Sequence, residues 1–262
     1  MKTILRRIRK KTKHIGFDPV LFLNSIRVFP FYIKDLRKIK KQKGTNNDFP
    51  FGNKFPILNE RFVSSGTMSG HYFHQDLLVA RKIFENKPKR HVDIGSRTDG
   101  FVAHLAVFRE VEVLDIRNQD SKVRNIIFKQ ANLMQLTDDM VGYCDSASAL
   151  HSIEHFGLGR YGDPIDYYGH LKGINNVHKM LQDGGNFYFS VPIGKQRIEF
   201  NAHRVFALEY LLNIFKGKFI VVSFSYVNDK GDLIENCKLH QNDINNNFNC
   251  IFGCGIFELK KM

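Results

Sequence analysis

The pattern of hydrophobic and polar positions becomes regular near residue 71. From there, short apolar runs alternate with amphipathic segments, which is typical of a βα-repeating, largely parallel sheet. The apolar runs predict strands over residues 90–95, 111–116, 125–129, 145–150 and 186–192, and two later strands over 218–227 and 253–261. The clearest amphipathic stretches predict helices over residues 71–87, 167–181 and 205–215. We therefore expect five parallel strands with intervening helices, closed by two late strands that pair as an antiparallel edge hairpin.

The same pattern divides the chain into three parts. Residues 1–43 form a basic amphipathic N-terminal extension, in which apolar residues interleave with Lys and Arg. Residues 44–70 contain the flexible stretch SSGTMSG and are expected to be a linker or a substrate-covering segment. Residues 71–262 form the predicted α/β domain.

Within the extension we predict a basic segment over residues 4–17, followed by a helix. Asp18 is the expected N-cap of this helix and Pro19 its first residue, because proline at that position loses no hydrogen bond. A second proline, Pro30, is expected to break the helix. The apolar and basic residues together suit an anionic membrane surface, where each cation contributes about 1 kcal/mol. The alternative is a solvated arm that packs loosely on its own domain.

Charge is concentrated in this extension. The net charge is +13, yet residues 1–43 hold 14 Lys and Arg against 2 Asp and Glu, while the remainder holds 25 against 24. Enzymes that act on nucleic acids usually need cations around the active cleft, because phosphate contacts dominate their affinity. The near-neutral remainder argues against a nucleic-acid partner.

Composition narrows the setting further. The chain has 43% hydrophobic, 13% aromatic and 25% charged residues, and no run reaches the roughly 18 apolar residues that a membrane span requires. The start, MKTILRRIRKK, lacks the apolar core of a signal peptide, so we expect a cytoplasmic protein. The four cysteines lack the spacing of a disulfide framework or a zinc knuckle, and we expect free thiols.

The stretch HVDIGSRTDGF is the most informative motif. A predicted strand ends in Asp93, and the chain turns at Gly95. Asp115 lies at the end of the next predicted strand, twenty residues after that glycine. Glycine lets backbone amides approach a ligand, and a carboxylate at the next strand end can accept hydrogen bonds from both ribose hydroxyls of an adenosine. Together these residues predict a nucleoside-binding site. Arg97 replaces the second glycine of the dinucleotide fingerprint, which disfavours NAD and FAD.

These residues resemble the first motif and the ribose acid of class I S-adenosylmethionine-dependent methyltransferases, whose seven-stranded, Rossmann-like sheet matches the predicted strand order. The resemblance implies S-adenosylmethionine as the cofactor. It places Leu150 and His151 under the methionine part and Asn132 or Leu133 beside adenine, although QAN lacks the aspartate that many members carry there. The implied cofactor-binding residues are Asp93, Gly95, Ser96, Asp115, Asn132, Leu133 and Leu150.

A closer resemblance covers residues 90–205. The strings ALHSIEHFGLGRYGDPID, LQDGGNFYFSVPIG and EFNAHR are similar to a bacterial methyltransferase-like family of poorly defined function, often associated with surface-polysaccharide synthesis. The strings GLGRYGDP and FNAHR are the most specific part of this resemblance. They imply a glycan-related setting without assigning a reaction.

The segment HSIEH carries the candidate chemistry. His155 is the first choice for a base that takes the proton of a hydroxyl acceptor, with His151 nearer the cofactor and Glu154 as orienter or alternative base. The segment also fits the inverted zinc-protease motif, which requires a continuous helix. A small-residue strand leads into it and glycines follow, so we expect no metal site of that kind. Each histidine has an ordinary structural role as its alternative.

Candidate substrate residues lie further along the chain. His203 and Arg204 follow the fifth strand and could bind sugar hydroxyls or a phosphate. The glycine-rich loop contributes Arg160, Tyr161 and Asp163, which form either a substrate wall or a compact structured turn. Enzymes that methylate exocyclic amines of bases typically carry an N-P-P-Y-like string after the fourth strand, and this chain has LHSIEH instead.

Two functions of different classes follow. The first is an O-methyltransferase that acts on a sugar hydroxyl of a nucleotide- or lipid-linked surface-glycan precursor. The second is a catalytically degenerate scaffold or binding protein of a glycan-synthesis complex, which the departures at Arg97 and residues 130–132 favour and the retained Asp93, Gly95 and Asp115 oppose.

Overall fold

The computed structural model describes Thr12 and residues 16–262. These described residues divide into two compact units, with the boundary between Thr67 and Met68. The predicted basic segment over residues 4–17 lies almost entirely outside the described residues. In the first unit, residues 44–67 contain neither a helix nor a strand, and the ion pair between Arg61 and Asp35, at 2.6 Å, links this stretch to the preceding helix.

That helix, α2 (Pro19–Lys43), begins as predicted, because the Asp18 side chain accepts hydrogen bonds from the amides of Val20 and Leu21. The predicted break at Pro30 is wrong, since α2 continues through it for 25 residues in all. The carbonyl of Ile26, which loses its partner at Pro30, belongs to an exposed residue where water can replace the missing N–H.

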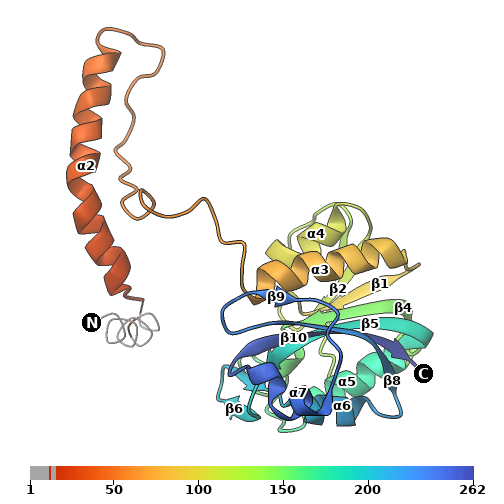
Figure 1. The fold of residues 1–262 in the computed structure, drawn as a ribbon. Coiled ribbons are helices and arrows are strands. Elements are labelled where there is room, and N and C mark those ends of the chain that lie inside the picture. Colours follow the sequence, from red (N-terminus) through yellow and green to blue (C-terminus); the bar gives the residue numbers. More distant parts are fainter. Residues whose placement is uncertain (1–11, 13–15) are drawn as a thin grey trace. The chain divides into compact units, whose positions relative to one another are not determined.

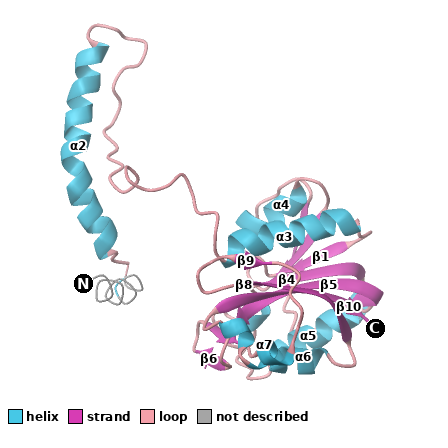
Figure 2. Ribbon diagram, in the orientation of Figure 1, coloured by secondary structure: helices cyan, strands magenta, loops and turns pink. Residues whose placement is uncertain are grey.

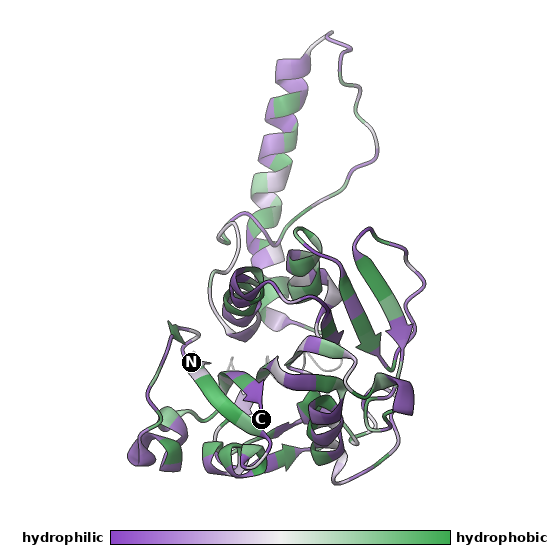
Figure 3. Cartoon of the chain, turned by 90° about the vertical axis from the view of Figure 1, so that its right-hand side faces the viewer, coloured by the Kyte–Doolittle hydropathy of each residue, from purple (hydrophilic) through white to green (hydrophobic). Residues whose placement is uncertain are grey.

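The character of α2 changes along its length. Its first part is apolar and its last turns are basic, as the colouring of Figure 3 shows. Several of its large apolar side chains are exposed, namely Leu21, Phe22, Leu23, Ile26, Phe29, Phe31 and Ile39. None of the helices in the described part of the chain has both the length and the apolarity to cross a bilayer.

The second unit is a mixed sheet of eight strands with helices on both faces (Figures 1 and 2). The strand order is β3-β2-β1-β4-β5-β10-β8-β9. The first five strands in this order are parallel, and the last three join by antiparallel pairing. The strands are β1 (His91–Ile94), β2 (Val111–Asp115), β3 (Ile126–Gln130), β4 (Cys144–Leu150), β5 (Leu181–Ile193), β8 (Phe219–Val227), β9 (Leu233–Ile234) and β10 (Gly253–Lys261).

The predicted α/β architecture is therefore confirmed, with two additions. The short β9 extends the expected seven strands to eight, and β6 (Arg197–Glu199) pairs with β7 (His203–Val205) as a separate hairpin. Gly184 and Gly185 lie within β5, where the pairing with β4 shifts register. The two late strands pair antiparallel as expected, and β10 lies between β5 and β8.

Each face of the sheet has its own apolar core. On one face, α3 (His71–Asn86), the π-helical turn Thr98–Val102 and α4 (Ala103–Ala106) pack through Val79, Ile83, Phe101 and Leu105. On the other face lie α5 (Gly169–Met180), α6 (Leu208–Phe215) and α7 (Gln241–Asn245), packed through Ile174, Val177, Leu211, Phe215 and Ile244. Among the parallel strands, β1 is buried along its whole length and β2 in all but its last residue, as expected for strands covered on both faces.

Candidate functional site

A cavity lies at the carboxyl ends of the parallel strands, where open α/β sheets bind their ligands. Its walls come from the ends of β1 and β2, the segment after β3, the turn after β4 and the glycine-rich loop. The lining residues are Ile94, Gly95, Leu114, Asp115, Ile116, Arg117, Ala131, Asn132, Leu133, Met134, His151, Ser152, His155, Phe156, Tyr161 and Asp163. About half of them are apolar, and the polar groups gather at the end of β2, in the turn after β4 and in the glycine-rich loop.

The turn after β1 is fixed by Asp93, which does not line the cavity. Its buried carboxylate accepts hydrogen bonds from the Ser96 amide at 3.0 Å, the Ser96 hydroxyl at 2.6 Å and the Ser148 hydroxyl at 2.5 Å. The Ser96 hydroxyl in turn accepts from the amide of Leu150 at 3.1 Å. Burial raises the pKa of Asp93 to about 6. Asp93, Ser96 and Leu150, all expected at the cofactor, therefore hold Gly95 in place rather than face the cavity.

Gly95 presents its backbone to the cavity. Its φ of +64° lies in the left-handed region, and a side chain there would meet Ser152 at 3.2 Å. The hydroxyl of Ser152 is buried and has no hydrogen-bond partner among the described residues. This orphaned group, next to a close-approach glycine, is suited to a polar ligand.

Asp115, at the end of β2, is held by Arg117 on the same edge of the cavity. The guanidinium donates to the two carboxylate oxygens from Nε at 3.0 Å and from Nη2 at 2.6 Å. It also lies 4.4 Å from the centre of the Tyr161 ring, which belongs to the opposite wall. The cavity measures about 60 Å³, whereas small-ligand pockets typically exceed about 300 Å³. Arg117 and Tyr161 therefore narrow the entrance beside the predicted ribose acid.

His155 lines the cavity from the turn that follows β4. Its Nδ1 donates to the carbonyl of Ala202 at 2.6 Å, which leaves Nε2 as the unprotonated nitrogen of the neutral ring. Nε2 is 3.7 Å from Oε1 of Glu154. Burial lowers the pKa of His155, so the ring is neutral near pH 7 and its Nε2 can accept a proton.

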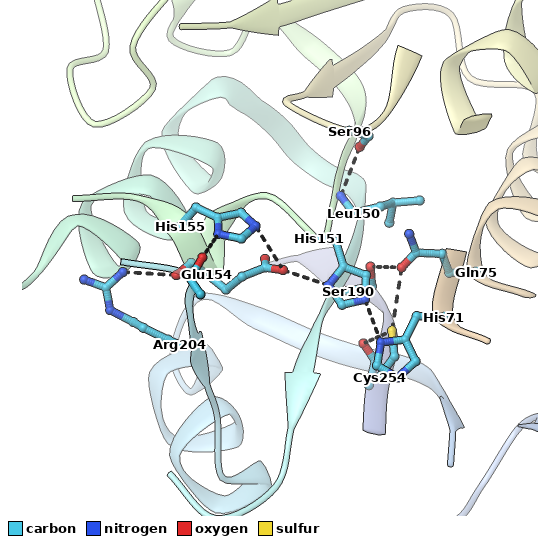
Figure 4. A network of polar contacts seen from close by, with 12 residues as sticks. His71, Gln75, Ser96, Leu150, His151, Glu154, His155, Ser190, Arg204 and Cys254 are labelled. Carbon is cyan, nitrogen blue, oxygen red and sulfur yellow. Dashed lines mark hydrogen bonds and ion pairs between the residues drawn. The ribbon is translucent and has the colours of Figure 1, made fainter. Parts of the chain in front are cut away.

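Glu154 connects the two histidines of the segment (Figure 4). Its Oε1 accepts a hydrogen bond from Nδ1 of His151 at 2.7 Å, and its Oε2 is buried without a hydrogen-bond partner in the described chain. Ile153–His155 form a single 3₁₀ turn rather than a helix, so the zinc-protease geometry is not present at this segment. The segment instead places His151 and His155 in the cavity lining, with the buried Glu154 in contact with both rings.

The glycine-rich loop is a compact turn organised by Asp163. The carboxylate accepts from the amides of Gly157 at 2.7 Å, Gly159 at 3.2 Å and Tyr161 at 3.2 Å. Asp163 and Tyr161 nevertheless reach the cavity, so the loop is both a structured turn and part of the wall. Arg160 points elsewhere and donates to the carbonyl of Ala202 at 2.9 Å.

The other two expected substrate residues lie outside the cavity lining. Arg204 is buried and donates to four backbone carbonyls, among them Phe156 at 2.6 Å and Tyr167 at 3.1 Å, so it clamps the loop in place. His203 is half-buried, 3.3 Å from the Glu199 carboxylate and beside the His155 ring.

The structure thus brings together Gly95, Asp115, Asn132, Leu133, His151, His155, Tyr161 and Asp163. Sequence reasoning missed Arg117 and Ser152. Arg117 has a visible signal, because a cation two residues after a strand-end aspartate can fold back on it. Ser152 has none, since its importance depends on the burial of an unpaired hydroxyl.

The residues present fit an adenosyl cofactor. Asp115 can accept hydrogen bonds from ribose hydroxyls, Leu133 and Ile116 offer apolar surface for a base, and Ser152 offers an unused hydroxyl. The fit requires the side chain of Arg117 to move. It is about half exposed, and ion pairs of this kind contribute only about 0–1 kcal/mol, so the movement is inexpensive in free energy.

Comparison with solved structures shows the fold. The 1,6-didemethyltoxoflavin-N1-methyltransferase of Burkholderia thailandensis, solved with 1,6-didemethyltoxoflavin and S-adenosylhomocysteine, is 12% identical with a TM-score of 0.50, over 72% of this chain and 78% of that one. The [4+2]-cyclase SpnF is 13% identical with a TM-score of 0.50, over 72% and 80%. The second unit has the Rossmann-like fold of class I S-adenosylmethionine-dependent methyltransferases, a fold that also supports a cyclase.

Comparison by sequence gives a family without an assigned reaction. No curated protein matches the chain. Residues 89–252 match the family described as "Caenorhabditis protein of unknown function, DUF268". This match spans β1 to the loop before β10 and includes the whole cavity lining. The chain therefore belongs to the DUF268 family.

Proposed function

We propose that this protein is an S-adenosylmethionine-dependent O-methyltransferase that acts on a sugar hydroxyl of a surface-glycan precursor. One observation carries the proposal: the cavity that contains Asp115 at the end of β2 also contains His155, whose Nε2 is left unprotonated by the Ala202 contact. A carboxylate that can bind ribose hydroxyls and a nitrogen that can accept a proton thus lie in one cavity, at the position where this fold binds its ligands.

Three parts of the chain would hold the cofactor. Gly95 would allow close approach of the backbone, Asp115 would bind the ribose, and the segment with Asn132 and Leu133 would flank the adenine. S-adenosylmethionine, when bound, supplies an electrophilic methyl group. The protein's own task is to align the acceptor oxygen with that group and to remove its proton.

His155 performs the proton transfer in this proposal. Its Nε2 takes the proton of the acceptor hydroxyl, and the Ala202 carbonyl keeps the ring in the required tautomer. The imidazolium that forms is stabilised by the Glu154 carboxylate, 3.7 Å from Nε2.

A sugar acceptor fits the charge of the molecule. The near-neutral remainder beyond residue 43 lacks the cations that nucleic acid needs. The strings over residues 90–205 that resemble glycan-cluster proteins favour a nucleotide- or lipid-linked precursor. Tyr161 on the cavity wall offers an aromatic face and a hydroxyl, both useful for a sugar ring.

We also propose that residues 1–43 attach the protein to the inner, anionic face of a membrane, where lipid-linked precursors would be available in the cytoplasm. In α2, exposed apolar side chains precede a segment that carries six cations and Asp35. Apolar side chains could enter the boundary between headgroups and acyl chains, while the cations meet anionic headgroups.

A vesicle experiment tests this attachment. Full-length protein should sediment with phosphatidylcholine vesicles that contain phosphatidylglycerol, and should remain unbound to phosphatidylcholine alone. Changing Lys34, Lys38 and Lys41 to Glu should abolish sedimentation, while the same change at Lys122, Lys195 and Lys230 should preserve it. Equal binding of both variants, or binding that ignores anionic lipid, would refute the attachment.

Calorimetry and methyl transfer test the enzyme itself. The protein should bind S-adenosylmethionine and S-adenosylhomocysteine, but neither NAD nor ATP. Labelled methyl groups should then appear on sugar nucleotides or on lipid-linked glycans. A well-folded protein that binds neither S-adenosyl compound would refute the proposal.

The second candidate is a degenerate scaffold of a glycan-synthesis complex. The observation that favours it is the narrow cavity, in which Arg117 donates hydrogen bonds to both oxygens of the Asp115 carboxylate that a ribose would need. The calorimetric experiment separates the two candidates. A scaffold would fail to bind the cofactor even when Arg117 is replaced by Ala.

A further inference from the structure

A second group of polar side chains meets behind the cavity wall. His71 begins α3, His151 follows β4, and Cys254 lies in β10, so the three residues come from distant parts of the sequence. One ligand atom of each, a ring nitrogen or Sγ, lies within 4.8 Å of the others. Figure 4 shows the two imidazole rings and the sulfur directed toward one another.

We propose that His71, His151 and Cys254 form a binding site for one zinc ion. Two imidazoles and a thiolate are ligands that zinc prefers, whereas calcium and magnesium prefer oxygen. The site is distinct from the H-x-x-E-H motif of the sequence. It uses His151 alone from that segment, together with partners that only the fold brings near.

The spacing of the two nitrogens fits one shared ion. Nδ1 of His71 and Nε2 of His151 are 3.2 Å apart, and two nitrogens at zinc-ligand distance in a tetrahedron are separated by about 3.3 Å. The two rings lie within 3° of parallel, with their centres 5.1 Å apart. Without an ion, the same spacing is a hydrogen bond in which one ring donates to the other.

The orientation of His151 favours the ion. Glu154 accepts the Nδ1 proton of this ring at 2.7 Å, which directs the lone pair of Nε2 toward His71 and Cys254. A carboxylate that fixes the far nitrogen of a histidine is the usual outer partner of a zinc-bound imidazole. His151 also has a φ of +51°, so the backbone places this ring at some conformational cost.

The surroundings are suited to holding an ion. The Phe252 ring lies 5.5 Å from the His71 ring, and the Tyr72 ring lies 5.1 Å from that of His151, so aromatic groups flank both ligands. Cys254 is fully buried, and its Sγ is 3.6 Å from the side-chain oxygen of Gln75. That amide oxygen accepts from Ser190 at 2.6 Å and is thus rigidly placed.

Three protein ligands make this resemble a catalytic rather than a structural zinc site, because structural sites usually have four. His151 belongs to both places, since it lines the cavity and contributes to the cluster. The zinc ion would therefore be bound by a residue of the same cavity that contains His155.

Metal analysis tests the site without any use of activity. Full-length protein, purified without chelators and dialysed against metal-free buffer, should retain about one zinc ion per chain. The Cys254→Ser and His71→Ala variants should each bind zinc at least about tenfold more weakly. The matched controls Cys250→Ser and His74→Ala, four and three residues from the ligands, should keep the wild-type zinc content.

Cobalt gives a second, spectroscopic readout of the same site. Adding Co²⁺ to metal-free wild-type protein should produce a thiolate-to-cobalt absorption band, which Cys254→Ser should lose and Cys250→Ser should keep. Glu154→Gln keeps all three ligands and should weaken zinc binding by about tenfold to a hundredfold, as expected for an outer-shell carboxylate.

Absence of both zinc and the thiolate band in folded wild-type protein would overturn the proposal, as would full retention of zinc in Cys254→Ser. The outcome is independent of the proposed function. A protein that binds zinc and no S-adenosyl compound would keep the metal site and refute the methyltransferase, and the reverse result would do the opposite.

Discussion

The two walls of the cavity are built in different ways. The wall with Gly95 and Asp115 comes from consecutive strand ends, because Gly95 follows β1 and Asp115 is the last residue of β2. The wall with His151 and His155 depends on residues that arrive from elsewhere, such as Ala202 from the β6–β7 hairpin and His71 from α3. The first wall is a local property of the chain, whereas the second requires the complete fold.

The largest expected effect is a loss of turnover, caused by a change on the second wall, without a loss of cofactor affinity at the first wall. Changing His155 to Gln should lower methyl-transfer turnover by about 10²- to 10⁴-fold, the usual contribution of a positioned base. Affinity for S-adenosylmethionine should stay within about twofold, because the cofactor contacts are on the other wall. The partly exposed His74 gives a matched His→Gln control in a helix outside the cavity. Full turnover in the His155 variant would remove this residue from the role of base.

The next effect belongs to the first wall. Changing Asp115 to Asn should weaken S-adenosylmethionine binding by about tenfold to a hundredfold, since hydrogen bonds to a charged group contribute about 1.5–3 kcal/mol. Calorimetry measures the change. Asp99→Asn is the control, because Asp99 makes the same kind of ion pair two residues from Arg97 but lies outside the cavity. Equal losses in both variants would point to a general charge effect.

The pH dependence of turnover should report the protonation of His155 on the second wall. His155 must be unprotonated to act as a base, so turnover should fall about tenfold per pH unit below its pKa. Burial lowers this pKa below the ordinary value of 6.5, although Glu154 partly opposes the shift. Turnover should therefore be flat at neutral pH and decline only in the acid range. A midpoint above 6.5 in the pH profile of kcat would contradict this assignment.

The same contrast explains what the sequence could reveal. The strands and the strand-end acid were predictable, because short apolar runs mark the strands and Asp115 stands at the end of one of these runs. The passage of α2 through Pro30 was not, since it depends on an exposed carbonyl that water can satisfy. Nor could the sequence show that the Arg204 guanidinium donates all its hydrogen bonds in the structure to backbone carbonyls, because these carbonyls lie 37 to 50 residues away in the chain.

The meeting of His71, His151 and Cys254 was equally beyond reach. Cys254 is more than 100 residues from His151, and no metal-ligand spacing links it to either histidine. Only the insertion of β10 beside β5 and the position of α3 bring them together. Side chains that act through tertiary contacts leave no local pattern, whereas strand-end residues do.

The smallest expected effect concerns Arg117, the residue that contacts both walls. Arg117 binds Asp115 on the first wall and lies over Tyr161 on the second, so it must release the carboxylate before a ribose can use it fully. Changing Arg117 to Ala removes this competition, and a partly exposed ion pair contributes about 0–1 kcal/mol, so affinity for S-adenosylmethionine should rise by up to about fivefold. The control is Arg97→Ala, which breaks the ion pair with Asp99 and should leave affinity unchanged. A loss of affinity in the Arg117 variant would show instead that the guanidinium contributes to binding, for example by covering the adenosyl group together with Tyr161, and the pair would then be a lid on the cavity rather than a competitor for Asp115.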